Sequence, residues 1–196
     1  MKEKMKLVVI GNGMAGMRTV EELLKLAPDL YEISVFGAEP YCNYNRILLS
    51  PVLAGEKTVE DIIINQDDWY NENGITLFKG ESVTQIDRKN RSVTGAKGTT
   101  IRYDRLLIAT GSSPFILPIP GRELSGVVGF RDIKDVERML DASKKGRHAV
   151  VIGGGLLGLE AANGLRKQGM EVTVVHNSAS LMDRQLDEPA AVLLQN

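Results

Sequence analysis

Two short glycine-rich segments, residues 11–16 and 153–158, share the spacing G-x-G-x-x-G. In such a segment the first glycine permits a tight turn, the second lets a ligand approach the backbone, and the third lets a helix pack closely on a strand. Backbone N–H groups and the positive end of a helix dipole then point at one place, where a pyrophosphate fits. The repeated spacing therefore predicts two dinucleotide sites. The glycines concerned are Gly11, Gly13, Gly16, Gly153, Gly155 and Gly158.

The residues on either side of each glycine segment predict the strand and helix that must position it. An apolar run comes directly before each segment, as in a buried strand, and an amphipathic run follows, as in a helix. A second apolar strand then closes each β-α-β unit. The strands are expected at residues 7–10, 31–36, 148–152 and 171–175, and the helices at residues 14–26 and 159–168.

One residue in each unit is a candidate for binding a ribose. Glu39 lies 23 positions after Gly16, close to where a carboxylate accepts a hydrogen bond from an adenosine ribose, although a solvated loop carboxylate is the alternative. His176 directly follows the last strand of the second unit. It is neither an acid that would favour NADH nor a base that would accept the 2′-phosphate of NADPH, so the pattern predicts NAD(P)H and leaves the choice open. A solvated loop histidine is the other interpretation of His176.

Further polar residues suit contacts to a bound cofactor. The segment 40–51 combines aromatic residues, Arg46 and Ser50 between two prolines, which is typical of a binding loop. Arg46 is suited to a phosphate or an electron-rich ring, and a salt-bridged surface arginine is the alternative. Glu160 lies early in the second helix, where it either stabilises the helix dipole alone or approaches the nicotinamide edge.

The remaining segments predict smaller elements between and after the two units. Thr58 and Asp61 resemble a capping box, and Asp132 is expected to be the N-cap of a helix. A small antiparallel β-meander is expected between Ile75 and Tyr103, inserted into the first unit. The other expected elements are helices at 58–65, 66–71, 132–145 and 187–195, a strand at 106–109 and an extended linker at 115–120.

Composition excludes several classes of protein. The chain has 196 residues, of which 43% are hydrophobic, and a formal net charge of −1, which is an ordinary globular composition without support for a nucleic-acid partner. No apolar run reaches the roughly 18 residues that a membrane span needs, and residues 1–6 lack a secretion signal, so we expect a cytoplasmic protein without a membrane partner. Cys42 is the single cysteine, which excludes an intrachain disulfide, a CxxC pair or an iron–sulfur cluster ligated within this chain. No metal site is expected.

These motifs together resemble the two-dinucleotide flavin reductases of the pyridine nucleotide–disulfide oxidoreductase superfamily. The first glycine segment matches the FAD motif of that superfamily, the segment 109–111 matches the chain that returns to FAD, and 153–161 matches the NAD(P)H motif. The resemblance implies an α/β fold with two Rossmann-like units. Besides the six glycines, the residues that it places at the cofactors are Met14, Ala15, Glu39, Arg46, Ser50, Val83, Ala109, Thr110, Gly111, Leu156, Leu157, Glu160 and His176.

Two motifs narrow the resemblance further. Glu39-Pro40 followed by the segment 44–50, and the segment 181–187, are similar to the N-terminal part of the large subunits of NAD(P)H-dependent nitrite reductases. The resemblance implies an electron-input module in which NAD(P)H passes a hydride to the flavin N5. The electrons would then go to an iron–sulfur cluster and sirohaem in downstream domains, where nitrite becomes ammonia. The resemblance also implies that a segment after the NAD(P)H-binding domain returns to complete the FAD site.

The expected domain order is an FAD-binding domain at 1–120, a linker and helix at 121–146, and an NAD(P)H-binding domain at 147–196. The second unit has two expected strands where roughly three are needed, so we expect a fragment of a longer protein. A stand-alone ferredoxin or rubredoxin-type carrier reductase is an alternative function, and a non-catalytic nucleotide-sensing module is another. Single-cysteine members of the superfamily carry a redox cysteine, but Cys42 stands in a different context, which favours a loop cysteine.

Overall fold

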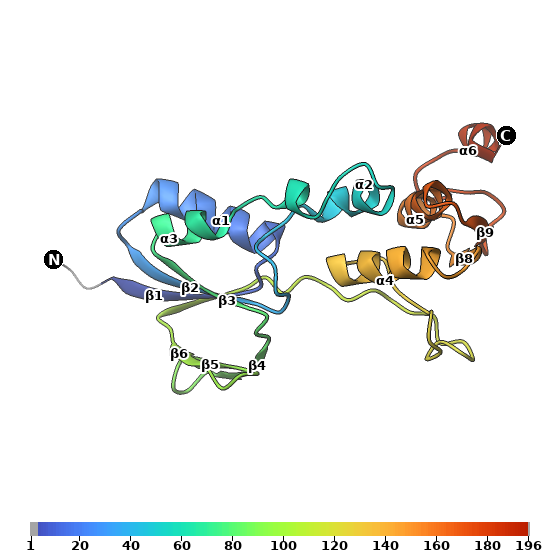
Figure 1. The fold of residues 1–196 in the computed structure, drawn as a ribbon. Coiled ribbons are helices and arrows are strands. Elements are labelled where there is room, and N and C mark those ends of the chain that lie inside the picture. The colour runs from blue at the N-terminus through green and yellow to red at the C-terminus, as the bar shows by residue number, and fades with distance from the viewer. Residues whose placement is uncertain (1–3, 196) are drawn as a thin grey trace. The chain divides into compact units, whose positions relative to one another are not determined.

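The computed structural model describes residues 4–195, which form two compact units (Figure 1). Within the described chain, the first unit comprises residues 4–45 and Ile63–Ser112, and the second comprises Arg46–Ile62 and residues 113–195. Each unit contains a parallel sheet with helices, so the predicted α/β class is confirmed. The segment Arg46–Ile62 leaves the first unit and returns to it, which no sequence pattern indicated. The assignment of FAD to 1–120 and of NAD(P)H to 147–196 stays a prediction.

The first unit is built on a four-stranded parallel sheet of order β3-β2-β1-β7. Two helices, α1 and α3, cover one face of this sheet, and an antiparallel sheet of β4, β5 and β6 lies on the other (Figure 1). The elements are β1 (Met5–Ile10), α1 (Met14–Leu26), β2 (Tyr31–Gly37), α3 (Asp67–Glu72), β3 (Ile75–Lys79), β4 (Val83–Asp87), β5 (Ser92–Gly95), β6 (Thr100–Arg102) and β7 (Arg105–Ile108).

Strand β1 is apolar from Leu7 to Ile10 because both of its faces are covered there. Leu7 and Val9 pack with Met17 and Val20 of α1 on the helical face. Val8 and Ile10 point the other way, because side chains alternate along a strand, and belong to a cluster on the side of the antiparallel sheet. All four are less than a tenth exposed. The continuous apolar run that predicted a buried strand therefore reflects burial on both faces.

Two predicted elements differ from the structure. Ile75–Lys79 pairs in parallel with β2 and extends the main sheet, so its inclusion in the antiparallel meander is wrong. Only β4, β5 and β6 form that meander. The helix predicted at 58–65 is also wrong, because only Glu60–Ile62 form a single 3-10 turn, η2. Ile63 then forms an extended bridge with Tyr44.

The second unit contains a two-stranded parallel sheet joined by a crossover helix. Helix α5 begins at Leu156, three residues earlier than predicted, and connects β8 to β9. Asp132 is confirmed as the N-cap of α4, because its Oδ1 accepts a hydrogen bond from the Asp135 N–H at 2.8 Å. The elements are η1 (Arg46–Leu48), α2 (Leu49–Leu53), η2 (Glu60–Ile62), α4 (Ile133–Ser143), β8 (His148–Ile152), α5 (Leu156–Lys167), β9 (Glu171–Val175) and α6 (Glu188–Gln195).

Helix α2 is an integral part of the second unit through its contact with α5. A methyl group added to Gly164 would lie 2.7 Å from Cγ of Leu53, so the glycine allows the two helices to approach. The Gln168 side chain donates to the Leu53 carbonyl oxygen at 2.8 Å, and Lys167 forms an ion pair with Glu56. The capping box at Thr58 and Asp61 is confirmed, with reciprocal bonds of 2.8 and 3.2 Å.

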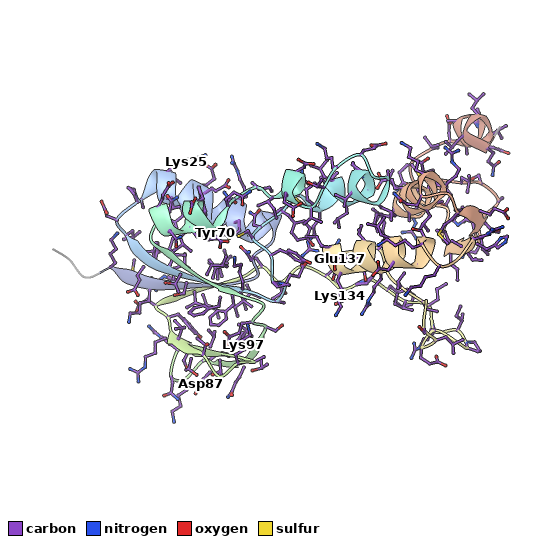
Figure 2. All side chains as sticks on the ribbon, viewed as in Figure 1. Lys25, Tyr70, Asp87, Lys97, Lys134 and Glu137 are labelled. Atoms are coloured by element: carbon purple, nitrogen blue, oxygen red, sulfur yellow. The ribbon has the colours of Figure 1, made fainter. Side chains whose placement is uncertain are left out.

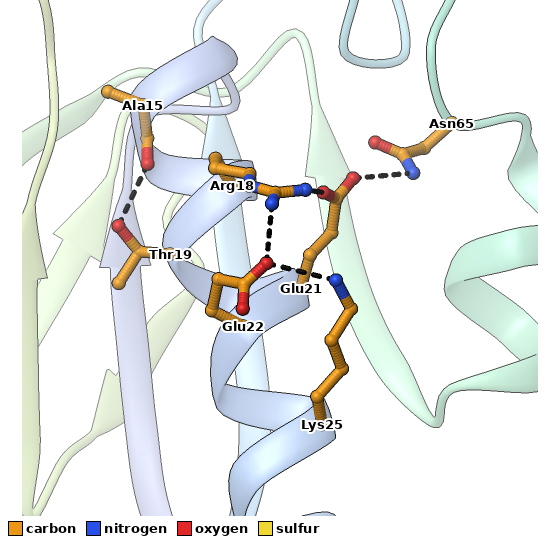
Figure 3. Close-up of polar contacts among 7 residues, drawn as sticks. All are labelled: Ala15, Arg18, Thr19, Glu21, Glu22, Lys25 and Asn65. Carbon is orange, nitrogen blue, oxygen red and sulfur yellow. Dashed lines mark hydrogen bonds and ion pairs between the residues drawn. The ribbon is translucent and has the colours of Figure 1, made fainter.

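The outer face of α1 carries a chain of polar contacts (Figure 3). Arg18 pairs with Glu21 and Glu22, and Lys25 pairs with Glu22 at 2.9 Å. Such exposed pairs contribute little to stability because solvent screens them. Asn65 donates to Glu21 at 3.2 Å and so connects α1 to the segment before α3. Across residues 4–195, none of the helices has the length and apolar character that crossing a membrane requires.

Candidate functional site

The first glycine segment forms the tight turn between β1 and α1. The Gly11 N–H donates to the Phe36 carbonyl at 2.8 Å, and the Ala109 N–H donates to the Ile10 carbonyl at 2.8 Å. Gly11 has φ +116°, and a methyl group added there would lie 2.2 Å from the Ala109 carbonyl oxygen. A methyl group on Gly16 would lie 2.7 Å from the Gly11 carbonyl oxygen. The first and third glycines are therefore required by the close packing of backbone on backbone.

Gly13 differs from both, because nothing lies within 4 Å of a methyl group added to it. It is the N-cap of α1, with φ −91° and ψ 175°, and no side chain caps the helix. The first turn, which begins with Met14 and Ala15, contains no acidic residue. Its N–H groups thus face an open space next to a positive helix end, which is the arrangement that binds a phosphate.

The second glycine segment repeats this geometry. The Gly153 N–H donates to the Val175 carbonyl at 2.8 Å, and a methyl group on Gly158 would lie 1.9 Å from the Gly153 carbonyl oxygen. Gly155 is the N-cap of α5 with φ −85° and ψ −178°, and it again faces open space and lacks a side-chain cap. The first turn, which begins with Leu156 and Leu157, has no acidic residue. Both segments therefore have room for a diphosphate at the middle glycine.

Glu39 lies in the loop after β2, as predicted, and its carboxylate is oriented by Tyr44. The Tyr44 hydroxyl donates to Glu39 Oε2 at 2.7 Å. The Glu39 carbonyl accepts from the Gly80 N–H at 2.9 Å, which joins this loop to the turn before β4. Val83 begins β4 and packs against the cluster around Phe36. The structure thus brings Glu39 and the start of β4 to the same end of the first unit.

The segment 109–111 follows β7 and lies against the first glycine segment. The Ala109 side chain would contact a methyl group on Gly16 at 3.2 Å, so Ala109 has to be small. Gly111 has φ +75°, which favours glycine, and Thr110 connects the two. The chain therefore passes close to the first turn before it leaves the first unit.

Asn12 and Tyr70 were missed by sequence reasoning although they hold the first turn. The Tyr70 hydroxyl donates to Asn12 Oδ1 at 2.8 Å and accepts from the Asn43 N–H at 3.3 Å. Asn12 Nδ2 donates to the Tyr41 carbonyl at 3.3 Å. Tyr70 is labelled in Figure 2, on α3, and it is 2% exposed. A tyrosine in a short helix far along the chain carries no sequence pattern for this role.

The second unit brings together two of the predicted cofactor contacts. The Ser50 hydroxyl, on α2, donates to Glu160 Oε2, on α5, at 2.5 Å. Arg46, in η1, donates from Nη1 to the Arg131 carbonyl at 3.0 Å. Arg46 and Ser50 therefore lie in the second unit, together with Glu160, and not in the first unit with Glu39.

His176 follows β9, and its ring is turned toward the second glycine segment. The Gly154 N–H donates to His176 Nδ1 at 3.1 Å. The His176 side chain is 16% exposed, so the alternative of a solvated loop histidine does not describe it.

Cys42 is a buried thiol, 8% exposed. Burial raises the pKa of Cys42 above its ordinary value, and this outweighs the nearby Lys79 ammonium, whose Nζ lies 3.9 Å from Sγ. A raised pKa disfavours the reactive thiolate. Among residues 4–195, no group of three or more His, Cys, Asp or Glu side chains is arranged to hold a metal ion.

Comparisons with known proteins agree with this geometry. The family model described as "Pyridine nucleotide-disulphide oxidoreductase" matches residues 5–196. The chain is 55% identical over 193 residues to "Nitrite reductase [NAD(P)H]" from Bacillus subtilis (strain 168), covering 98% of this chain and 24% of that protein. It is 53% identical to "Assimilatory nitrate reductase electron transfer subunit" from the same organism, covering 98% of this chain and 25% of that protein.

Solved structures with the same fold include NADH:rubredoxin oxidoreductase from Clostridium acetobutylicum, with a TM-score of 0.85 and 30% identity over 98% of this chain and 50% of that chain. The chain thus spans about a quarter of the length of the two Bacillus relatives and half of this structure. The family implies a pyridine nucleotide and FAD as cofactors. Since the family model covers nearly the whole sequence, the chain belongs to the pyridine nucleotide-disulphide oxidoreductase family.

Proposed function

We propose that this chain is the electron-input part of an NAD(P)H-dependent flavoprotein, with FAD in the first unit and NAD(P)H in the second. The observation that carries the proposal is the pair of equivalent glycine turns. In each, a middle glycine faces open space beside an uncapped helix N-terminus, while the outer glycines are packed. With both cofactors bound, the chemistry supplied is hydride transfer from the nicotinamide to the flavin.

The side chains of this chain bind and orient the cofactors in this proposal. The N–H groups at Gly13, Met14 and Ala15 hold the FAD pyrophosphate, and Glu39 accepts from the adenosine ribose. In the second unit, the N–H groups after Gly155 hold the NAD(P)H pyrophosphate. No general acid or base is needed, because hydride transfer between stacked rings depends on position and electrostatics.

The remaining predicted contacts keep their assignments within this proposal. Ala109, Thr110 and Gly111 lie against the first turn and line the FAD side of the first unit, with Val83 at the adenosine end. Leu156 and Leu157 shape the pyrophosphate turn of the second unit, and His176 lies next to it. Arg46 and Ser50 keep their assignment as cofactor contacts, as does Glu160 at the nicotinamide, and all three lie in the second unit.

The relatives favour nitrite reduction as the function of the whole protein. Two Bacillus proteins with more than half of the residues identical are named for nitrite reductase and for electron transfer in nitrate assimilation. We propose that electrons pass from this chain to iron–sulfur and sirohaem centres in further domains, where nitrite becomes ammonia. This chain has a single cysteine and so does not itself supply the ligands of a cluster.

A carrier reductase is the second candidate, because "NADH-rubredoxin oxidoreductase" from Clostridium acetobutylicum is 30% identical. In that case, a separate protein such as a ferredoxin or rubredoxin receives the electrons. The sequence encoded after Asn196 separates the two candidates. Cysteine-rich segments would support the nitrite reductase, and a short C-terminal domain would support the carrier reductase.

The test is reduction of a bound flavin in the purified protein expressed from the whole gene. We expect a yellow protein whose flavin absorbance near 450 nm is bleached by NADH or NADPH in the absence of oxygen. The Gly13→Ala variant should lose flavin while it stays folded, and Gly155→Ala should keep flavin but be reduced slowly. A protein that binds a nucleotide and shows no flavin reduction would support the non-catalytic sensing module instead.

A further inference from the structure

The carboxylate of Asp183 lies beside the second glycine segment, and it was not among the predicted site residues. Its Oδ1 is 3.7 Å from His176 Nε2, and its Oδ2 accepts a hydrogen bond from the Ser178 hydroxyl at 2.8 Å. The Asp183 side chain is 38% exposed, so the carboxylate keeps lone pairs that face solvent. The Asp183 carboxylate is therefore positioned by Ser178 and is still accessible to accept a hydrogen bond from a ligand.

His176 is hydrogen-bonded to the second glycine turn and therefore does not serve as the ribose contact. Its Nδ1 accepts the Gly154 N–H at 3.1 Å, which places the proton of the neutral ring on Nε2. Nε2 is buried, has no hydrogen-bond partner within residues 4–195, and lies on the side of Asp183. The ring also occupies the space next to Gly154, because a methyl group added there would lie 2.8 Å from its Cγ.

The segment that carries Asp183 is folded onto the same turn. The Met182 N–H donates to the Gly154 carbonyl at 2.9 Å. Leu181 lies so close that its Cδ2 would be 2.5 Å from a methyl group on Gly154. Met182 has φ +56°, an uncommon value for a residue with a side chain. This backbone conformation places the next residue, Asp183, beside the His176 ring.

Asp183 and Glu39 both lie in the loop that follows the second strand of their β-α-β unit. Glu39 comes two residues after β2 ends at Gly37, and Asp183 comes eight residues after β9 ends at Val175. Both carboxylates are oriented by a hydroxyl donor, Tyr44 in one unit and Ser178 in the other. Each unit therefore has one carboxylate that a hydroxyl holds in the loop after the second strand of the unit, the loop that carries the ribose acceptor in such units.

From these observations we propose that Asp183 is the coenzyme-specificity residue of the second unit and that it selects NADH over NADPH. This inference rests on the proposed function of the second unit as the NAD(P)H site. The carboxylate accepts a hydrogen bond from the 2′-hydroxyl of the adenosine ribose. The 2′-phosphate of NADPH would bring a second negative charge to the same place and is repelled.

Arg184 is the residue that argues for the opposite preference, because an arginine at this position could pair with a 2′-phosphate. It follows Asp183 directly and is exposed. Asp183, in contrast, is positioned by Ser178 and lies beside the turn, so its charge is the one held at the site. The experiment therefore changes both residues separately.

The test measures equilibrium dissociation constants of NADH and NADPH with the protein expressed from the whole gene. Each coenzyme is used as its 1,4,5,6-tetrahydro analogue, which keeps the adenosine ribose and cannot donate a hydride, so the flavin stays oxidised. The unsubstituted protein should bind NADH at least about tenfold more tightly than NADPH, as expected when one charge-assisted hydrogen bond is replaced by a repulsion. Asp183→Asn should weaken NADH binding several-fold, strengthen NADPH binding and bring the two constants close together.

Three further variants make the outcome decisive. Ser178→Ala should shift the ratio in the same direction but by less, because the carboxylate remains and only its orientation is lost. Arg184→Ala and the remote Asp141→Asn should leave the NADH preference in place. A native preference for NADPH, or a ratio that Asp183→Asn leaves unchanged, would overturn the inference about Asp183 alone. If neither coenzyme bound the unsubstituted protein, the proposed function would fail as well.

Discussion

The Tyr70 hydroxyl donates a hydrogen bond to Asn12 Oδ1 at 2.8 Å, which joins helix α3 to the glycine turn after β1. The same oxygen accepts the Asn43 N–H at 3.3 Å, so the loop after β2 is held at the same point. Tyr70 is 2% exposed, so both bonds are made by a buried side chain. One hydroxyl thus fixes two loops that contribute to the proposed FAD site.

Removal of that hydroxyl should loosen the FAD site as well as lower stability. Tyr70→Phe leaves Asn12 Oδ1 and the Asn43 N–H without this partner, and we expect a loss of about 1–3 kcal/mol in the free energy of unfolding. Flavin should also dissociate more readily, because the turn is no longer held. Urea denaturation and the dissociation constant of FAD measure the two effects.

Tyr103→Phe is the matched control for Tyr70→Phe. Tyr103 is partly buried in the same unit, beside the antiparallel sheet, and its hydroxyl makes no hydrogen bond within residues 4–195. This control should retain both stability and flavin affinity. If Tyr70→Phe lowered stability without weakening FAD, the contact would be structural only.

Tyr70 should also make the protein sensitive to alkaline pH. Burial raises the pKa of Tyr70 to about 12 in the folded state, compared with about 10 in an unfolded chain. Because the folded pKa is the higher one, this contribution to stability is fully present below about pH 10 and is lost as pH rises toward 12. Between these values the free energy of unfolding should fall by up to about 1.4 kcal/mol per pH unit more than in Tyr70→Phe.

The glycines of each turn should divide into two groups when replaced by alanine. Gly11→Ala and Gly158→Ala place a methyl group within 2.2 and 1.9 Å of a carbonyl oxygen, and roughly 3 kcal/mol or more of stability should be lost. Gly13→Ala and Gly155→Ala place it in open space at an ordinary φ, so stability should change by less than about 1 kcal/mol.

The two variants that keep their stability, Gly13→Ala and Gly155→Ala, should be the ones that lose nucleotide affinity. The methyl groups of Gly13→Ala and Gly155→Ala occupy the space through which a diphosphate approaches, and binding should weaken at least about tenfold in the corresponding unit. Thermal unfolding and equilibrium titration with FAD and NADH provide both measurements. Unchanged affinity in Gly13→Ala and Gly155→Ala would argue against phosphate binding at these turns.

The bond between Ser50 and Glu160 should show coupling in a double-mutant cycle. Ser50→Ala and Glu160→Gln each remove or weaken the 2.5 Å contact between α2 and α5, and the expected coupling energy is about 1–2 kcal/mol. The pair Glu56→Gln and Lys167→Met, an exposed contact between the same segment and α5, should give less than about 1 kcal/mol. Equal coupling energies in both cycles would show that the partly buried pair of Ser50 and Glu160 contributes no more to stability than the exposed pair.

Cys42 should react slowly while the protein is folded. Its thiol is buried and its raised pKa disfavours the thiolate, so we expect modification by a disulfide reagent at pH 8 to be at least about 100-fold slower than in urea. Cys42→Ala should keep reduction of flavin by NAD(P)H. Rapid labelling of the native protein, together with loss of flavin reduction in Cys42→Ala, would favour the redox role instead.

The glycine turns could be predicted because their requirements are local. The spacing that let us place Gly11 and Gly158 in tight turns reflects contacts within a few residues or with an adjacent strand. The apolar runs around them identified β1 and β8 for the same reason, since a strand buried on both faces has few polar positions. The α/β class followed directly from these two repeats.

The contacts that depend on distant segments could not be predicted. Ile75–Lys79 has the short apolar pattern of any strand, and only its pairing with β2 decides that it belongs to the parallel sheet. His176 looked like a possible ribose contact, yet the Gly154 N–H determines where its ring lies. Asp183 lies eight residues beyond the end of β9, so the spacing after Gly158 does not predict it, and only the bond from the Met182 N–H to the Gly154 carbonyl brings it beside the turn.

The early position of helix α2 in the chain has a consequence for synthesis on the ribosome. Leu53 packs against Gly164, which is made 111 residues later. At ordinary rates of translation this interval lasts roughly 5–20 s, during which the apolar side of α2 has no α5 to cover it. Leu49, Val52 and Leu53, all buried in the finished second unit, therefore form an apolar segment of the nascent chain to which a chaperone can bind transiently.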